Sequence, residues 1–155
     1  MAKTAITKCA EAFLWRELIE NKIGIYGCFE VNLGKRDPWM KGREIVDFIT
    51  YQNEGTFRCY EIKVTENDFN SDAAVSFKGH FNYYVLSAEL YGKVAAKIPE
   101  GIGVVLFDVY SEKRHPVRAK RKIVSLFDSV MMTECMMKSL HREQTKLYKD
   151  KGYWN

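Results

Sequence analysis

The stretch REIVDFITYQNEGTFRCYEIKV, residues 43–64, decides the fold class. Residues 43–52 and 57–64 are rich in β-branched and aromatic side chains, which is typical of β-strands. The tripeptide NEG between them is a short turn, so the two runs are predicted to form a β-hairpin. The hairpin determines which side chains of the two strands lie on the same face of the sheet.

Charged side chains interrupt the apolar rows of this hairpin. Residues two apart along a strand share a face, so Glu61 and Lys63 are neighbours and continue the row of Cys59. Asp47 similarly follows Ile45 on the paired strand. An acid on each of two paired strands, where alternation favours an apolar residue, indicates either a salt bridge at a sheet edge or a functional site.

The remaining chain alternates between helical and strand-like patterns around the hairpin. Together these patterns predict an α/β protein of the α+β type, in which a mixed sheet is covered by helices. The expected elements are a helix from about Thr4 to Ile19, a strand at 28–34, the hairpin, a short helix within 66–79, a strand at 82–87, a helix at 89–99, a strand at 101–110 and a long helix at about 125–150.

Composition favours one domain spanning residues 1–155. The chain is 46% hydrophobic, which is ordinary for a globular core. No apolar run of about 18 residues occurs, and the charged N-terminus lacks the apolar region of a signal peptide, so we expect a cytoplasmic protein with no membrane partner. The four cysteines are far apart without a CxxC pair and are expected to be free thiols rather than zinc ligands.

Positive charge is concentrated between Asp108 and Lys122. This segment has six Lys or Arg residues against two acids, whereas the formal net charge of the whole chain is only +4. Such a segment is typical of an electrostatic contact with phosphates or of a solvated surface hairpin. The nucleic-acid-binding candidates within it are Lys113, Arg114, Arg118, Lys120, Arg121 and Lys122.

Two further acids lie where they can join Asp47 and Glu61. Glu30 shares a face with Cys28 on the preceding strand, and Glu17 projects from the centre of the apolar stripe of the first helix. Clustered carboxylates repel one another unless a cation lies among them, and a hard divalent ion such as Mg²⁺ prefers oxygen ligands. The pattern therefore favours a magnesium site, with Glu17 and Glu30 both open as the additional acid.

An Asp on one strand followed by Glu-x-Lys on the next, here VDF and EIK, resembles the PD-(D/E)XK nuclease superfamily. The similarity extends over about Cys28 to Phe107 and includes phage-type and DNA-repair-associated members. Val46 stands where the family name has Pro. The resemblance implies a restriction-endonuclease-like αβββαβ core followed by a C-terminal helix.

The resemblance also implies roles for individual residues. Asp47, Glu61 and the carbonyl of Ile62 would hold Mg²⁺, with Mn²⁺ able to substitute, and Lys63 would serve the attacking water and the phosphate. Glu30 is the preferred additional acid, with Glu17 as the alternative.

We therefore expect a metal-dependent deoxyribonuclease that acts on DNA in phage or DNA-repair processing. A catalytically inactive module that binds nucleic acid or a protein partner is the alternative. A homodimer is a further expectation, because active members of this fold commonly need two sites for a double-strand cut. The long C-terminal helix carries an apolar stripe that is expected to be a docking face, with a dimer seam as the alternative, and it is also consistent with a place in a larger assembly. The substrate can be duplex, single-stranded or branched DNA, or RNA.

Overall fold

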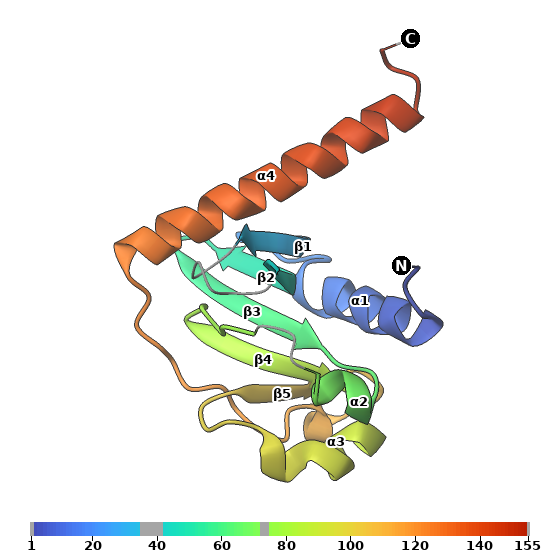
Figure 1. Ribbon diagram of the computed structural model, residues 1–155, viewed down its shortest axis with the longest axis vertical. Helices are drawn as coiled ribbons and strands as arrows, with labels where there is room; N and C mark the ends of the chain where they lie inside the picture. Colours follow the sequence, from blue (N-terminus) through green and yellow to red (C-terminus); the bar gives the residue numbers. More distant parts are fainter. Residues whose placement is uncertain (1, 35–41, 72–74, 155) are drawn as a thin grey trace.

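The central element is a five-stranded mixed sheet. The computed structural model describes residues 2–34, 42–71 and 75–154. Neighbouring strands follow one another in chain order, with antiparallel pairs from β1 to β3 and parallel pairs from β3 to β5 (Figure 1). The strands are β1 (Ile25–Gly34), β2 (Glu44–Gln52), β3 (Thr56–Ile62), β4 (Phe81–Leu86) and β5 (Gly103–Leu106).

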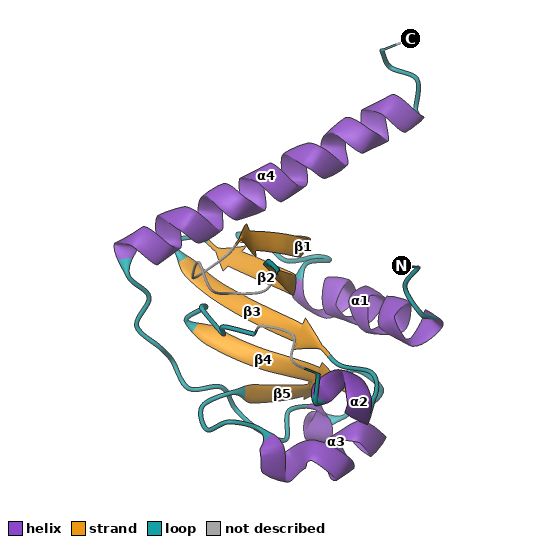
Figure 2. Ribbon diagram, viewed as in Figure 1, coloured by secondary structure: helices purple, strands orange, loops and turns teal. Residues whose placement is uncertain are grey.

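The described residues form four α-helices that accompany the sheet (Figure 2). Each begins after a Ser or Thr whose side chain accepts a hydrogen bond from a backbone N–H of the first turn, which satisfies a donor that the helix itself cannot. They are α1 (Ala5–Leu18), α2 (Glu66–Phe69), α3 (Ala88–Val94) and α4 (Leu126–Asp150), with 3₁₀ turns at Ala95–Lys97 and Glu112–Arg114. The expected mixed α/β class, the helix and strand order and the C-terminal helix are confirmed.

Three predicted elements are shorter than their sequence patterns. The helix expected within 66–79 is the single turn α2, and residues 72–74 lie outside the described part of the chain. The strand expected at 101–110 is limited to β5, because the chain turns after it and Asp108 accepts a hydrogen bond from the N–H of Ala88. β3 ends at Ile62, so Lys63 lies just beyond the strand, although its N–H still donates to the carbonyl of Val85 at 3.2 Å.

One face of the sheet is covered by α1. Its buried side chains Ala10, Phe13 and Leu14 pack against residues of β2 to β5, among them Tyr60 and Val85. Burial of this apolar surface, at about 25 cal/mol per Å², fixes α1 across the middle of the sheet.

The opposite face is divided between two helices. Met132 and Met136 of α4 pack on β1, β2 and the first part of β3, including Cys59. Leu90 of α3 packs on β4 and β5 around Leu86. Glu61 continues the row of Cys59, so it lies on this face between the areas that α4 and α3 cover. None of the described helices has the length and apolar character required to cross a membrane.

Candidate active site

Asp47 is held at the point where β2 and β3 separate. The described backbone pairs of these strands end at Phe48 and Tyr60, and the Asp47 carboxylate then accepts a hydrogen bond of 2.7 Å from the N–H of Ile62. Burial raises the pKa of Asp47 to about 6, although this hydrogen bond and the Lys63 charge both act to lower it. The carboxylate thus sits where losing a proton is costly.

Glu61 is a buried carboxyl beside a second carboxyl. Burial is the main cause that raises its pKa to about 8, and the negative charge of Asp47 raises it further. The Lys63 ammonium acts in the opposite direction. Two adjacent acids whose pKa values are both raised need a positive charge if both are to ionise near neutral pH.

Lys63 supplies one such charge. Its side chain is only 5% exposed, and its Nζ lies 3.7 Å from the Glu61 carboxylate and 3.8 Å from that of Asp68. Asp68 is itself positioned by the N–H of Val64, which donates to it at 3.1 Å, and by the capping hydroxyl of Thr65. The structure therefore brings Asp47, Glu61 and Lys63 together at the end of β3.

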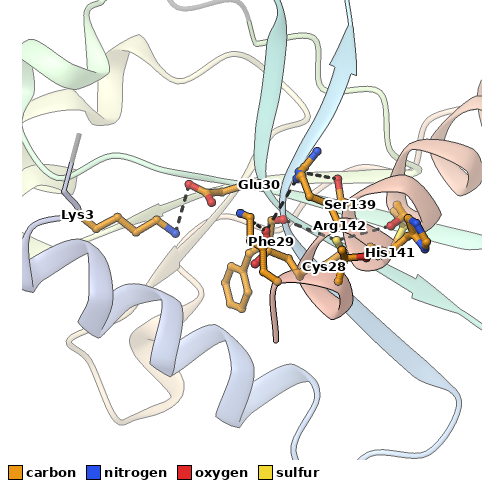
Figure 3. A network of polar contacts seen from close by, with 11 residues as sticks. Lys3, Cys28, Phe29, Glu30, Ser139, His141 and Arg142 are labelled. Carbon is orange, nitrogen blue, oxygen red and sulfur yellow. Dashed lines mark hydrogen bonds and ion pairs between the residues drawn. The ribbon is translucent and has the colours of Figure 1, made fainter. Parts of the chain in front are cut away.

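Glu30 lies in line with Asp47 and Glu61 but points to solvent. The pairs Phe29 with Phe48 and Val31 with Val46 flank it, so its strand position is opposite Asp47. Its φ of 52° is in the left-handed region, and its side chain is 57% exposed. The Nζ of Lys3 reaches from the chain before α1 to within 3.4 Å of the Glu30 carboxylate (Figure 3).

Lys3 connects Glu30 to an acid that the sequence patterns did not select. Its ammonium also forms an ion pair with Glu11 of α1. Burial disfavours the charge of Lys3, but the two glutamates outweigh it and raise its pKa. Glu11 is close enough to Asp47 for its charge to raise the pKa of that carboxyl. Of the acids of α1, Glu11 is the one that faces the candidate site.

Glu17 has a different partner. Its carboxylate accepts a hydrogen bond of 2.6 Å from Arg114 of the basic segment. Six residues separate it from Glu11, which is about 9 Å along a helix. Both Glu17 and Arg114 line a pocket of about 330 Å³ on the α1 face, floored by Tyr60 and Tyr83. The structure does not bring Glu17 to Asp47.

A further buried acid, Glu44, lies near Glu61. It accepts a hydrogen bond of 2.6 Å from the N–H of Ser76, and its charge is one of the causes that raise the pKa of Glu61. Both glutamates line the same small cavity together with Val46 and Phe77. Glu44 stands at the start of a predicted strand, and the alternation of side chains along that strand did not predict that it is buried.

The second half of the basic segment lies at the other end of the sheet. The N–H of Lys122 donates to the carbonyl of His80, and that of Lys120 donates to Gly101, so this part of the chain runs past the starts of β4 and β5. Arg121 stacks over the Phe81 ring at 5.7 Å. Because β3, β4 and β5 are parallel, their starts are the end opposite to Glu61.

No family model matches the chain. No curated protein matches it either. Among solved structures it is similar to the SPO1766 protein of unknown function from Silicibacter pomeroyi, with 16% sequence identity and a TM-score of 0.65 over 94% of this chain and 91% of that one. A likeness at this level of identity shows a shared fold alone.

The donor set for a metal is incomplete in the described residues. Across 2–34, 42–71 and 75–154, no three His, Cys, Asp or Glu side chains gather closely enough to hold an ion by themselves. Asp47, which is partly buried, and Glu61, which is buried, are nevertheless adjacent, and the backbone of Ile62 lies beside the Asp47 carboxylate. This oxygen-rich set suits Mg²⁺, which keeps several waters and takes only one or two carboxylates from a protein.

Proposed function

We propose that this chain is a Mg²⁺-dependent nuclease of the PD-(D/E)XK type that hydrolyses phosphodiester bonds of DNA, in phage or DNA-repair processing. One observation carries the proposal: Asp47, Glu61 and Lys63 are gathered at the end of β3, and the pKa values of both acids are raised. A salt bridge alone needs one acid and one base, whereas here one buried acid, Glu61, and one partly buried acid, Asp47, accompany the buried Lys63.

Asp47, Glu61 and the carbonyl of Ile62 are the groups that would hold the metal. When bound, Mg²⁺ supplies polarisation of the phosphoryl oxygens and a bound water of lowered pKa. The hydrogen bond from the N–H of Ile62 fixes one oxygen of Asp47, and burial restricts the rotamers of Glu61. The two carboxylates are thus positioned by the protein before any ion arrives.

Lys63 provides a fixed positive charge beside these acids. Because its ammonium is buried and tied to Glu61 and Asp68, it retains its position without a substrate. A preorganised charge of this kind stabilises the negative charge that develops on a phosphate, and its N–H donors can orient the attacking water. Glu11 is the residue that we place as the additional acid, with Glu30 further out on β1.

An inactive module that binds nucleic acid or protein is the second candidate. It is favoured by the ion pairs that already compensate the acids, namely Lys63 with Glu61 and Lys3 with Glu11. In that case the cluster would be a buried polar network with a structural role. The two candidates differ in whether the cluster binds a divalent ion.

The test combines metal binding with cleavage. Calorimetric titration with Mg²⁺ and Mn²⁺ measures binding, and a panel of labelled duplex, single-stranded and branched DNA and of RNA measures hydrolysis. We expect metal-dependent cleavage by the wild type and its loss in Asp47→Asn and Glu61→Gln. Glu17→Gln, which removes a carboxylate outside the cluster, is the matched control and should cleave normally. DNA binding with no metal uptake would favour the inactive module.

A further inference from the structure

Helix α4 carries an exposed apolar stripe along most of its length. Its residues are spaced alternately by three and four positions, which is the heptad pattern of a helix that packs on another helix. The apolar members are between 47% and 65% exposed. The stripe consists of Val130, Thr133, Met137, Leu140, Gln144 and Leu147.

This stripe is separate from the side of α4 that faces the sheet. The buried residues of the helix are Met132, Met136 and Ser139. At 100° per residue, the centre of the exposed stripe is about a quarter turn away from their direction. The helix therefore has one apolar side packed on the sheet and a second that no other part of the described chain covers.

The two halves of α4 have different surroundings. Ser139 is the last buried residue, and every residue from Leu140 to Asp150 is exposed. Figure 1 shows this second half extending past the sheet. An isolated helical segment of this length is marginal in water, so packing against a further surface would stabilise it.

A groove runs beside the first half of the helix. Tyr51 and Phe57 of the sheet form one wall and Val130 and Met137 the other, around a hollow of about 520 Å³. A second hollow of about 410 Å³ shares Tyr51 and Met137 and continues along the helix to Leu140. The groove is lined mainly by apolar side chains, and a helix presenting its own apolar side would fill it.

We propose that the occupant is α4 of a second copy of this chain, lying antiparallel to the first. With Val130 opposite the partner's Leu147, the register also sets Met137 opposite the partner's Leu140 and Thr133 opposite the partner's Gln144. Apolar residues then meet apolar ones and polar meet polar in every layer. The second half of each helix lies over the groove of the other molecule, which makes a closed two-fold interface.

Charge and shape both favour the antiparallel direction. In this register Glu134 lies beside the partner's His141, whose imidazole N–H donates to a carboxylate in either protonation state. Antiparallel helices also align their dipoles favourably. A parallel pair would bring both sheets to the same end of the helices, whereas the antiparallel pair separates them, since each sheet packs only on the first half of its own α4.

Sedimentation or light scattering of the full chain, from micromolar to submillimolar concentration, tests the interface. We expect twice the 18.0 kDa chain mass for the wild type and the chain mass for Leu140→Glu. Thr145→Glu adds the same charge on the outward side of the helix and should remain dimeric. Circular dichroism checks that each variant is folded. A monomeric wild type, or a dimer that Leu140→Glu leaves intact, overturns the proposal.

A charge exchange tests the direction. Glu134→Arg should weaken the dimer, and adding His141→Glu should restore it, because the two positions face each other only when the helices are antiparallel. Weakening without restoration overturns the antiparallel register. The dimer does not depend on the proposed nuclease activity, since none of these residues belongs to the acid cluster.

Discussion

The carboxylate of Asp47 accepts a hydrogen bond of 2.7 Å from the N–H of Ile62, so a side chain joins β2 to β3 just where their backbone pairing stops. The bond places the partly buried Asp47 beside the buried Glu61. A raised pKa for each is the electrostatic consequence. This coupling leads to a prediction about stability.

Without metal, the protein should lose stability as the pH rises from about 4.5 to 8. The pKa of Glu61 is raised from 4.5 to about 8, so the folded chain holds this proton more tightly than the unfolded chain does. The stabilisation that this proton gives the folded chain is complete below pH 4.5 and is lost as the pH rises through about 8. Asp47 acts in the same direction at lower pH. We expect the free energy of unfolding to fall by several kcal/mol over this range.

Thermal unfolding in a chelator, compared with Glu61→Gln, measures this contribution. The variant carries no titrating carboxyl at position 61 and should show a smaller decline over the same range. Excess Mg²⁺ should reduce the decline of the wild type. Parallel curves for the two proteins would contradict a raised pKa at Glu61.

Lys63→Met should abolish cleavage while leaving the fold intact. Removing a preorganised charge at a site of developing negative charge typically costs about 10²–10³ in rate. Lys78→Met is the matched control, because Lys78 is also partly buried and ion-paired, with Asp128 of α4 at 3.2 Å. Single-turnover cleavage measures both. Equal rates for the two variants would remove Lys63 from the mechanism.

Glu11→Gln and Glu17→Gln should have opposite outcomes. Glu11 is close enough to Asp47 to raise its pKa, whereas Glu17 is paired with Arg114 about 9 Å further along α1. We expect Glu11→Gln to weaken Mn²⁺ binding and cleavage about tenfold, or about 1.4 kcal/mol. Glu17→Gln should match the wild type in both. If instead Glu17→Gln weakens both properties and Glu11→Gln does not, Glu17 is the additional acid.

The hairpin was the most predictable part of this molecule. Alternation along residues 43–64 placed Glu61 on the row of Cys59, and the structure retains that row. The positions of Asp47 and Glu61 follow from local strand pairing, which a sequence pattern specifies. The mixed sheet and its covering helices followed from the same kind of local pattern.

The choice between Glu11 and Glu17 could not be made from periodicity. A helical stripe indicates which side of α1 is buried, but the direction in which α1 crosses the sheet decides which of its acids reaches β2. Glu17 projects from the centre of the stripe and is nevertheless exposed, because it reaches Arg114 over a pocket. Lys3 precedes the helix, so no helical pattern pointed to it. Such tertiary relations are absent from a single sequence.

Lys3→Ala should raise the affinity of the cluster for divalent ions. The Lys3 ammonium pairs with Glu11 and Glu30 and would compete with a metal for the first of these. A partly exposed ion pair contributes up to about 1 kcal/mol, so we expect an affinity gain of about threefold to fivefold. Lys8→Ala removes an exposed lysine of α1 and is the control. Calorimetry with Mn²⁺ gives both constants, and a loss of affinity in Lys3→Ala would mean that Lys3 supports the site instead.

Removing Arg118 and Arg121 should weaken DNA binding without affecting metal binding. These arginines belong to the basic segment that passes the starts of β4 and β5, away from Glu61, so their contribution is to the phosphate backbone. Each lost phosphate contact lowers the slope of log affinity against log salt by about 0.9 for duplex DNA.

The measurement uses Glu61→Gln as the background, so that the DNA stays intact, and fluorescence anisotropy at several salt concentrations. We expect the double variant Arg118→Ala with Arg121→Ala to reduce the slope of log affinity against log salt by about 0.9 to 1.8, which corresponds to one or two lost phosphate contacts. Lys138→Ala with Lys149→Ala removes the same charge from α4 and should leave the slope unchanged. If the α4 variant lowers the slope and the arginine variant does not, the DNA path runs along α4, and the basic segment has no part in binding.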